Sequence, residues 1–246
     1  MRMRKLFAVL TMALTMVFPA ALAAADTLRV ATDATFPPME FVQNGQRAGF
    51  DIDLIEALAK AMGKQVQWID IDFKGLVPGL VANRFDVAAS AIYITDERKK
   101  VVDFTDPYYN GGLTVIVHKD NKAINTPADL AGKKVSVQVG TKSVNFLKEN
   151  YPAVQRVEVE KNQEMFDLLL VGRVDAVVTG RPAAGQFAKA QPSVRLLDAA
   201  LTTEQYGYAL RKDETALMAQ FNQALQKLKA DGTYDKLVAK WFGAGK

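Results

Sequence analysis

Short apolar runs alternate along the chain with segments whose apolar residues recur at helical spacing. The runs predict buried strands, and the segments between them predict amphipathic helices. The predicted strands cover 28–32, 66–71, 87–94, 134–139, 175–179 and 202–210. The predicted helices cover 52–62, 76–81, 144–150, 161–171, 183–190, 217–228 and 234–242. This alternation predicts an α/β fold with largely parallel sheets that are covered by helices on both faces.

Turn and cap residues give these elements their predicted ends. Asn44-Gly45 between two short apolar runs predicts a hairpin. Asp51 is expected to cap the helix that follows it, and Gly63 is expected to end that helix. Thr95 is expected to cap a short helix that begins with Asp96 and Glu97.

A short internal repeat suggests that the chain builds two similar lobes. The hexapeptide Asn83–Ala88 is matched by Gly172–Val177, and each follows a predicted helix and enters a predicted strand. We therefore expect a first lobe from 26–107 and 207–246, and a second lobe from 113–201. Strand-like segments at 108–112 and 202–206 would cross between the lobes and form a hinge around a cleft.

The N-terminal segment has the pattern of a secretory signal peptide. Residues 1–25 combine three basic residues, an apolar stretch and two A-x-A cleavage sites, after Ala23 or Ala25. Removing it lowers the formal net charge from +4 to about +1, with both signs interspersed, so nucleic acid is an unexpected partner. The remaining chain is expected to be a soluble exported protein of a bacterial periplasm.

The amino-acid composition excludes several classes of functional site. The chain has no Cys, which excludes disulfides, thiolate metal sites and Cys nucleophiles. Its single histidine, His118, sits in a polar turn context and is read as a surface residue. A histidine metal site and a Ser-His-Asp triad are thereby excluded, and no metal or cofactor is predicted.

Candidate binding residues cluster at the ends of predicted strands, where open α/β sheets bind ligands. Asp33 and Phe36 follow the first strand, and Phe73 follows the second. Asp33 could instead be a turn residue, and each ring could instead belong to the core. Arg98 lies in the first turn of a helix, where a cation opposes the helix dipole, so it is either an exposed side chain or a group that binds an anion. The segment Gly140–Ser143 opens a helix, which suits either an anion or an ordinary cap.

Taken as a set, seven segments resemble the polar amino-acid-binding proteins of bacterial ABC importers, the solute-binding protein family 3, and most of all its glutamine-binding members. The segments are ATDATFPPMEF (31–41), GFDIDLIEALAKAMG (49–63), DFKGLVPGL (72–80), ITDERKKVVDFTDPYY (94–109), VGTKSVNFL (139–147), GRVDAVV (172–178) and GTYDKLVAKWFG (232–243). The resemblance covers the chain after the signal peptide. It implies the two-lobed periplasmic-binding-protein fold (type II), with two hinge strands and the ligand in the interlobe cleft.

The resemblance also implies roles for individual residues. Arg98 matches the arginine that clamps the ligand carboxylate, and Phe36 and Phe73 match the stacking aromatics. Asp33 matches the acid that contacts the ligand side chain. Backbone contacts would come from Ser90 and Ala91, and an anion cradle from Gly140 and Thr141.

Three positions depart from the family pattern. Tyr93 replaces a small hydroxyl residue that helps to hold the α-amino group, and Gly180 replaces the Asp that pairs with it. Gln138 occupies a cradle position that is often Lys or Arg. The ligand is therefore expected to carry a modified or missing amino group, or a cation that stacks on Tyr93.

The sequence thus predicts a periplasmic receptor, not an enzyme, that delivers an amino acid or amino-acid-like carboxylate to a membrane permease of an ABC transporter. A monomer is expected. Two alternatives remain: a dehydratase-like enzyme on the same fold, with Asp33 or Glu204 as its acid, and a soluble receptor for a signalling system.

Overall fold

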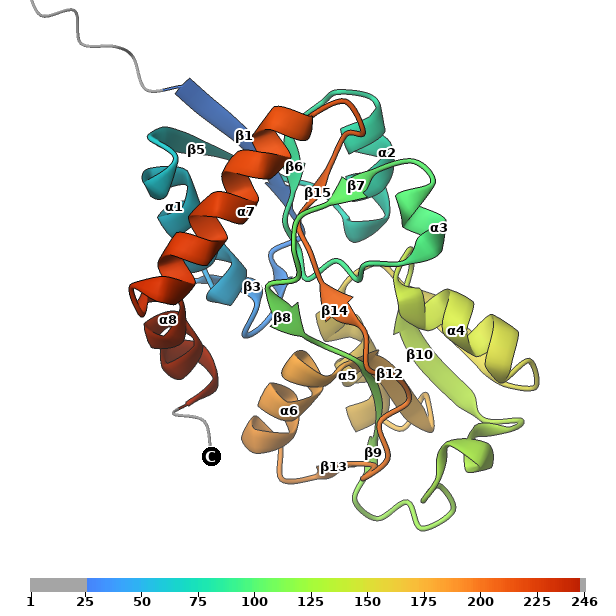
Figure 1. Cartoon of the computed structure of the whole chain (residues 1–246). Helices are drawn as coiled ribbons and strands as arrows, with labels where there is room; N and C mark the ends of the chain where they lie inside the picture. Colours follow the sequence, from blue (N-terminus) through green and yellow to red (C-terminus); the bar gives the residue numbers. More distant parts are fainter. Residues whose placement is uncertain (1–25, 244–246) are drawn as a thin grey trace, which may run out of the picture.

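The computed structural model describes residues 26–243 of the 246-residue chain. The predicted signal peptide, 1–25, lies outside the described residues. The described chain forms two α/β lobes, each built around its own five-stranded sheet (Figure 1). The predicted α/β, two-lobed fold is therefore confirmed.

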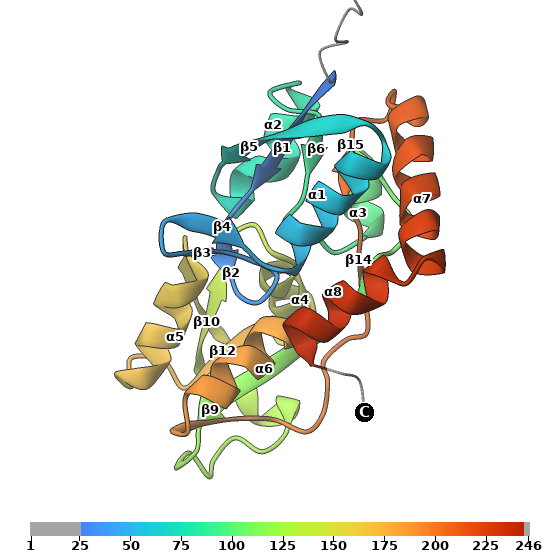
Figure 2. The ribbon, with the colours of Figure 1, turned by 90° about the vertical axis from the view of Figure 1, so that its left-hand side faces the viewer.

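Lobe 1 is the lobe that contains the first strand. Its sheet has the order β5-β1-β6-β15-β7, with bounds Lys64–Asp70, Asp26–Thr32, Val87–Ala88, Ala209–Leu210 and Asp103–Phe104. Its helices are α1 (Phe50–Ala61), α2 (Leu76–Val81), α3 (Asp96–Lys99), α7 (Thr215–Ala230) and α8 (Thr233–Phe242), and a 3₁₀ turn at Phe73–Gly75 precedes α2. Helices α1 and α7 cover one side of the sheet and α2 covers the other (Figure 2).

Lobe 2 repeats this arrangement. Its sheet has the order β11-β10-β12-β9-β13, with bounds Gln155–Val159, Lys134–Gln138, Ala176–Gly180, Leu113–His118 and Val194–Leu196. Its helices are α4 (Lys142–Asn150), α5 (Asn162–Leu170) and α6 (Arg181–Ala190), with a 3₁₀ turn at Pro127–Leu130. In both sheets three parallel strands are followed by one antiparallel strand, β15 or β9. The two lobes thus share one topology, as the internal repeat predicts.

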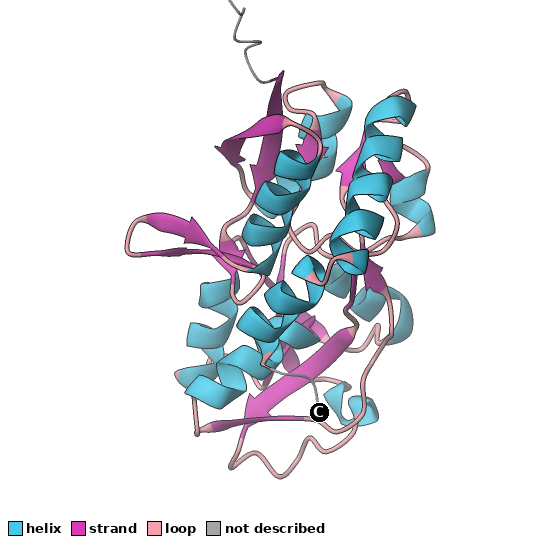
Figure 3. Ribbon diagram, turned by 60° about the vertical axis from the view of Figure 1, so that its left-hand side comes forward, coloured by secondary structure: helices cyan, strands magenta, loops and turns pink. Residues whose placement is uncertain are grey.

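Burial on both faces of each sheet explains the continuous apolar strands. In β1, Leu28 and Val30 pack into one core cluster while Ala31 packs into another. In β12, Val178 and Val177 divide in the same way between two clusters. Figure 3 shows the strands of each lobe flanked by helices on both sides. Such a sheet has no polar face, which is why period-two alternation is weak in these strands.

A two-stranded antiparallel pair links the lobes (Figure 1). It joins β8 (Tyr109–Asn110) to β14 (Gln205–Tyr206), within the segments predicted to be hinge strands. Because both crossings pair side by side, bending at this point is expected to move one lobe against the other; the hinge role stays a prediction. No helix in the described part of the chain is both long and apolar enough to cross a membrane.

Two local predictions are corrected. Asp51 is not a helix cap: α1 begins at Phe50 with Gly49 before it, and Asp51 lies buried in the first turn with its carboxylate turned into lobe 1. The strand predicted over 87–94 ends at Ala88, because Ala91 takes a left-handed backbone conformation with φ 44°. The hairpin at Asn44-Gly45 is confirmed: it connects β3 (Glu40–Gln43) to β4 (Gln46–Ala48), and β2 (Thr35–Phe36) pairs with β3.

The start of α1 generates a stability prediction. Gly49 has φ 132°, and a β-carbon there would lie 2.1 Å from the carbonyl oxygen of Met39. Gly49→Ala is expected to lower the free energy of unfolding by at least ~2 kcal/mol, since the strained backbone and the clash add. The melting temperature should fall by about 4–8 °C in calorimetry.

The matched control is Gly185→Ala. Gly185 lies inside α6 with open space around its α-carbon, so alanine should raise helix stability by about 1 kcal/mol. Equal melting temperatures for the two variants would contradict the conformational argument.

Candidate functional site

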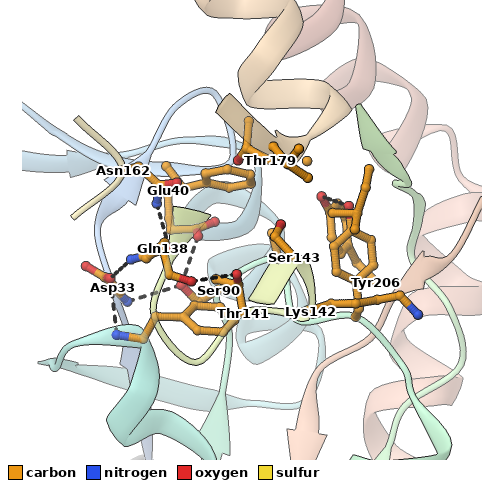
Figure 4. A pocket seen from close by; sticks show the side chains of 17 residues that line it. Asp33, Glu40, Ser90, Gln138, Thr141, Lys142, Ser143, Asn162, Thr179 and Tyr206 are labelled. Carbon is orange, nitrogen blue, oxygen red and sulfur yellow. Dashed lines mark hydrogen bonds between the residues drawn. The ribbon is translucent and has the colours of Figure 1, made fainter. Parts of the chain in front are cut away.

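A cavity lies between the lobes at the carboxyl ends of β1, β10 and β12 (Figure 4). Nine of the ten predicted site residues line it: Asp33, Phe36, Phe73, Ser90, Ala91, Tyr93, Gln138, Thr141 and Gly180. The tenth, Arg98, lines an adjoining groove that shares Phe73, Thr141 and Lys142 with the cavity. Residues from both lobes therefore converge where parallel strands end, which is where α/β sheets bind ligands.

The cavity is small in this conformation. Its volume is about 30 Å³, which is enough for a water molecule. An amino acid needs more room, so binding requires the lobes to separate or the lining side chains to move.

The Asp33 carboxylate joins the two lobes. From lobe 1 it accepts hydrogen bonds from the Thr35 hydroxyl (3.1 Å) and the Phe73 backbone N–H (3.2 Å). From lobe 2 it accepts from Gln138 Nε2 (2.8 Å) and Lys161 Nζ (3.1 Å), and Figure 4 shows Gln138 turned toward it. Both oxygens of this buried acid are thus occupied, and Lys161 balances its charge.

The loop at Ser90 and Ala91 is held by buried carboxylates. The Ala91 backbone N–H donates to Asp51 Oδ2 at 2.8 Å, which fixes the left-handed backbone of Ala91. The Ser90 hydroxyl donates to Glu40 Oε1 at 2.8 Å and accepts from the Asp33 backbone N–H at 3.2 Å. These contacts explain how a strained loop keeps its place in the cavity wall.

Glu40 and Asp51 form a buried pair of acids. Their side chains are 1% and 0% exposed, and Glu40 Oε2 and Asp51 Oδ1 have no hydrogen-bond partner among the described residues. Burial raises the pKa of Glu40 well above its usual range, and the neighbouring Asp51 raises it further. Burial also raises the pKa of Asp51 to about 7, against hydrogen bonds from Ala91 and Tyr108 that lower it.

Arg98 lies at the lobe interface beside the cavity. Thr95 caps its helix as predicted, by accepting from the Arg98 backbone N–H at 3.2 Å. The guanidinium donates to the carbonyl oxygens of Tyr93 (2.8 Å) and Gly140 (3.3 Å), and it lies 5.6 Å from the Phe73 ring centroid. Burial lowers the pKa of Arg98 to about 10. Among residues 26–243, no carboxylate forms an ion pair with it.

The start of α4 faces the same region. Thr141 precedes the helix, but its hydroxyl donates to the Gln138 carbonyl oxygen at 2.7 Å and does not cap the helix N–H groups. Gly140 has φ 76° and packs against the backbone of Lys74 in lobe 1. Gly140, Thr141 and Lys142 also line the groove that Arg98 lines, so a helix N-terminus, which favours anions, lies at the edge of that groove.

Several residues of the site were not predicted from the sequence. Glu40, Leu113, Lys142, Ser143, Asn162, Val178, Thr179 and Tyr206 also line the cavity, and Lys161 reaches Asp33 from its rim. Lys161 and Asn162 stand at the start of α5, where the helix pattern alone carries no sign of an ion pair across the cleft. Tyr206 lies in a predicted hinge segment, where its sequence context indicates an ordinary strand residue.

Comparison with known proteins gives consistent matches. Residues 28–244 match the family of bacterial extracellular solute-binding proteins, family 3. The ABC transporter arginine-binding protein 1 of Escherichia coli (strain K12) is 36% identical over 89% of this chain and 92% of its own length. The L-cystine-binding protein TcyJ of the same strain is 34% identical over 89% and 83%. A crystal structure of the ancestral amino acid-binding protein AncCDT-1, a precursor of cyclohexadienyl dehydratase, superimposes with a TM-score of 0.83 at 44% identity, covering 88% of this chain and 95% of that one.

The acid pair generates a prediction for pH dependence. Both acids have a higher pKa in the folded protein than in the unfolded chain, so folding is favoured while their protons are bound. This contribution is complete below about pH 4 and is lost as the pH rises, through about 7 for Asp51. Glu40→Gln removes one titrating group but keeps a donor for Asp51. Between pH 5 and 8 its free energy of unfolding should fall less steeply than that of the wild type, by up to about 1.4 kcal/mol per pH unit.

Urea unfolding at a series of pH values measures this slope. Glu56→Gln, on the exposed face of α1, is the control and should keep the wild-type slope. Parallel curves for wild type and Glu40→Gln would show that Glu40 is ionised in the folded protein.

Proposed function

Because the chain belongs to the bacterial extracellular solute-binding proteins of family 3, we propose that it is a periplasmic receptor that captures a small carboxylate for an ABC transporter. The ligand would be an amino acid or an amino-acid-like molecule, held between the two lobes. The lobes would close on it by bending at the β8–β14 pair.

The observation that carries this proposal is the unpaired cation at the lobe interface. The Arg98 guanidinium is bonded to two carbonyl oxygens, one from each lobe, and has no carboxylate partner in the described chain. A half-buried guanidinium without a counter-ion is unfavourable, and an incoming carboxylate would supply one through two parallel hydrogen bonds. Because those carbonyls come from both lobes, the same contact would link binding to closure.

The rest of the site suits a bound side chain. Phe36 and Phe73 line the cavity, where the sequence predicts stacking aromatics. The α4 start at Gly140 and Thr141 lines the same groove as Arg98, so lobe 2 would present a helix N-terminus to the ligand carboxylate. Which side chain is bound stays open: the relatives named above bind arginine and L-cystine, so specificity for glutamine stays a prediction.

The remaining parts of the proposal rest on family membership and sequence. A receptor of this kind would dock on the membrane permease of an ABC transporter, and the arginine-binding relative is named as a protein of an ABC transporter. Export would depend on the predicted signal peptide, 1–25. We also propose that the receptor acts as a monomer.

The enzyme alternative has weaker support. AncCDT-1 is described as a precursor of a dehydratase, yet it is itself named an amino acid-binding protein. The two acids considered for such chemistry are both paired: Asp33 with Lys161, and Glu204 with Lys142 at 2.6 Å. The Lys142 partner lowers the pKa of Glu204 against the opposing effect of burial, so Glu204 is a poor general acid. Formation of a product when the protein is incubated with a cyclic, prephenate-like acid would favour the enzyme. The other alternative, a soluble receptor for a signalling system, would bind the same ligand as the transport receptor.

Thermal shift tests the carboxylate assignment. A ligand at 1,000 times its dissociation constant adds roughly 4 kcal/mol, a rise of roughly 8–16 °C for a chain of this size. A panel of amino acids and amino-acid-like carboxylates should contain at least one such ligand. Arg98→Met should weaken the binding of that ligand by at least ~30-fold, because the ligand carboxylate loses its charged partner in the closed site.

The matched control is Arg173→Met, an exposed arginine in the turn after α5. It should bind as the wild type does. Unchanged binding by Arg98→Met would remove the support for the carboxylate site and for the proposal that depends on it.

A further inference from the structure

Two tyrosines in contact form the cavity wall nearest the predicted hinge. Tyr93 and Tyr206 have ring centroids 4.5 Å apart, and their backbones form an isolated antiparallel bridge. The Tyr206 hydroxyl donates to the Tyr93 hydroxyl at 3.1 Å, which in turn donates to the Gly112 carbonyl oxygen at 2.9 Å. Both hydrogens of the pair are therefore used inside the protein, and the Tyr206 oxygen keeps a lone pair as an acceptor.

The tyrosine pair occupies the space in front of Gly180. A β-carbon at Gly180 would lie 2.6 Å from Tyr206 Oη, 2.9 Å from Phe36 Cζ and 3.2 Å from Tyr93 Oη. The backbone of Gly180 is not left-handed, with φ −66°, so space and not conformation requires glycine here. An acidic side chain at position 180 would clash with the two tyrosines in these positions, so position 180 cannot supply a carboxylate to the cavity.

The first acid in the cavity wall has no capacity left for a ligand cation. Asp33 accepts four hydrogen bonds, and one of its donors is the Lys161 ammonium. A second ammonium would have to displace a donor that already neutralises it.

The second acid in the wall, Glu40, is disfavoured as a carboxylate. It is buried and accepts from the Ser90 hydroxyl, and burial beside Asp51 raises its pKa well above the usual range. Asp33, Tyr108, Tyr206 and Tyr208 are the other titratable groups around Glu40 and Asp51, and none of them supplies a positive charge. Ionising Glu40 to receive a ligand ammonium would place its charge beside the Asp51 carboxyl group in a buried site.

The bound carboxylate fixes which part of the ligand meets this wall. In the proposed function, which this inference rests on, the carboxylate binds Arg98, whose guanidinium contacts the Tyr93 carbonyl oxygen. We place the substituent on the neighbouring carbon against Tyr93, Tyr206 and Gly180, because these residues line the cavity that adjoins the Arg98 groove. An ammonium there would be buried against phenol rings, and Glu40, whose Oε2 has no hydrogen-bond partner among the described residues, would have to ionise to pair with it.

We propose that the site selects small carboxylates whose α-substituent is uncharged, a hydroxyl or an acylamino group, over the corresponding α-ammonium acids. The Tyr206 oxygen would accept the hydrogen of that substituent. The specificity-determining residues are Tyr93, Tyr206 and Gly180. The two tyrosine hydroxyls occupy the space that a side chain at position 180 would need, so the three residues act together.

Isothermal titration of the purified protein with matched triplets tests this inference without any substitution. Each triplet shares a side chain: L-leucine, its 2-hydroxy analogue and N-acetyl-L-leucine, with the same sets for phenylalanine and glutamine. In at least one triplet, the hydroxy or acetyl member should bind at least ~30-fold more tightly than the amino acid. Equal or tighter binding of the amino acid in every triplet that binds, or no binding by any hydroxy or acetyl member, would overturn the inference.

Further measurements distinguish a failure of this inference from a failure of the proposed function. Tyr206→Phe keeps the ring but removes the hydroxyl oxygen that accepts the hydrogen bond. It should therefore weaken the binding of the preferred triplet member about 10-fold. The binding of a matched ligand with hydrogen at the α-position should barely change. Tight binding of a quaternary betaine alone would mean that the rings recognise a cation, and would also overturn the inference. If the matched alcohols and amides without a carboxylate bind as well as the acids, the proposed function fails instead, whichever α-substituent is preferred.

Discussion

The structure of the site depends on the Asp33 carboxylate and the four donors that surround it. Two donors belong to lobe 1 and two to lobe 2, so this one buried acid is satisfied only when the lobes are together. Lys161 also pairs with Asp72 at 2.6 Å, and Lys74 with Glu160 at 2.6 Å, beside it. Separating the lobes would expose these charges to water, where ion pairs contribute little, so the balance between open and closed forms is expected to be close.

Most other charged side chains in the cleft also have partners that compensate their charge. Asp33 is saturated with donors, burial raises the pKa of Glu40 well above its usual range, and Lys142 in the wall is paired with Glu204. Arg98 is the exception among the described residues of the cleft, since only carbonyl oxygens accept from it. A cation without a carboxylate partner is suited to a ligand that carries a carboxylate.

Much of the site followed from local features of the sequence. The apolar strands, the Asn44-Gly45 hairpin and the Thr95 cap depend on residues close together in the chain, so pattern reasoning found them. The carboxyl ends of parallel strands lie at one edge of a sheet, which is why Asp33, Phe36 and Phe73 were expected near one cleft, whereas Ser90 and Gly180 were implied by the family resemblance. Asp51 was misassigned because a first-turn acid looks the same in sequence whether it faces solvent or the core.

The sequence by itself determined the α/β class, the order of the main elements and nine of the seventeen residues that line the cavity. Only the tertiary structure decided how their charges and volumes combine. Gln138 and Lys161 meet Asp33 across 105 and 128 positions of the chain, and Tyr206 meets Tyr93 across 113. Such contacts depend on the packing of one lobe against the other and on the path of the hinge segments, and no local periodicity or propensity encodes them. For that reason Gly180 reads in sequence as a missing acid, and in the structure as the space that two tyrosines fill.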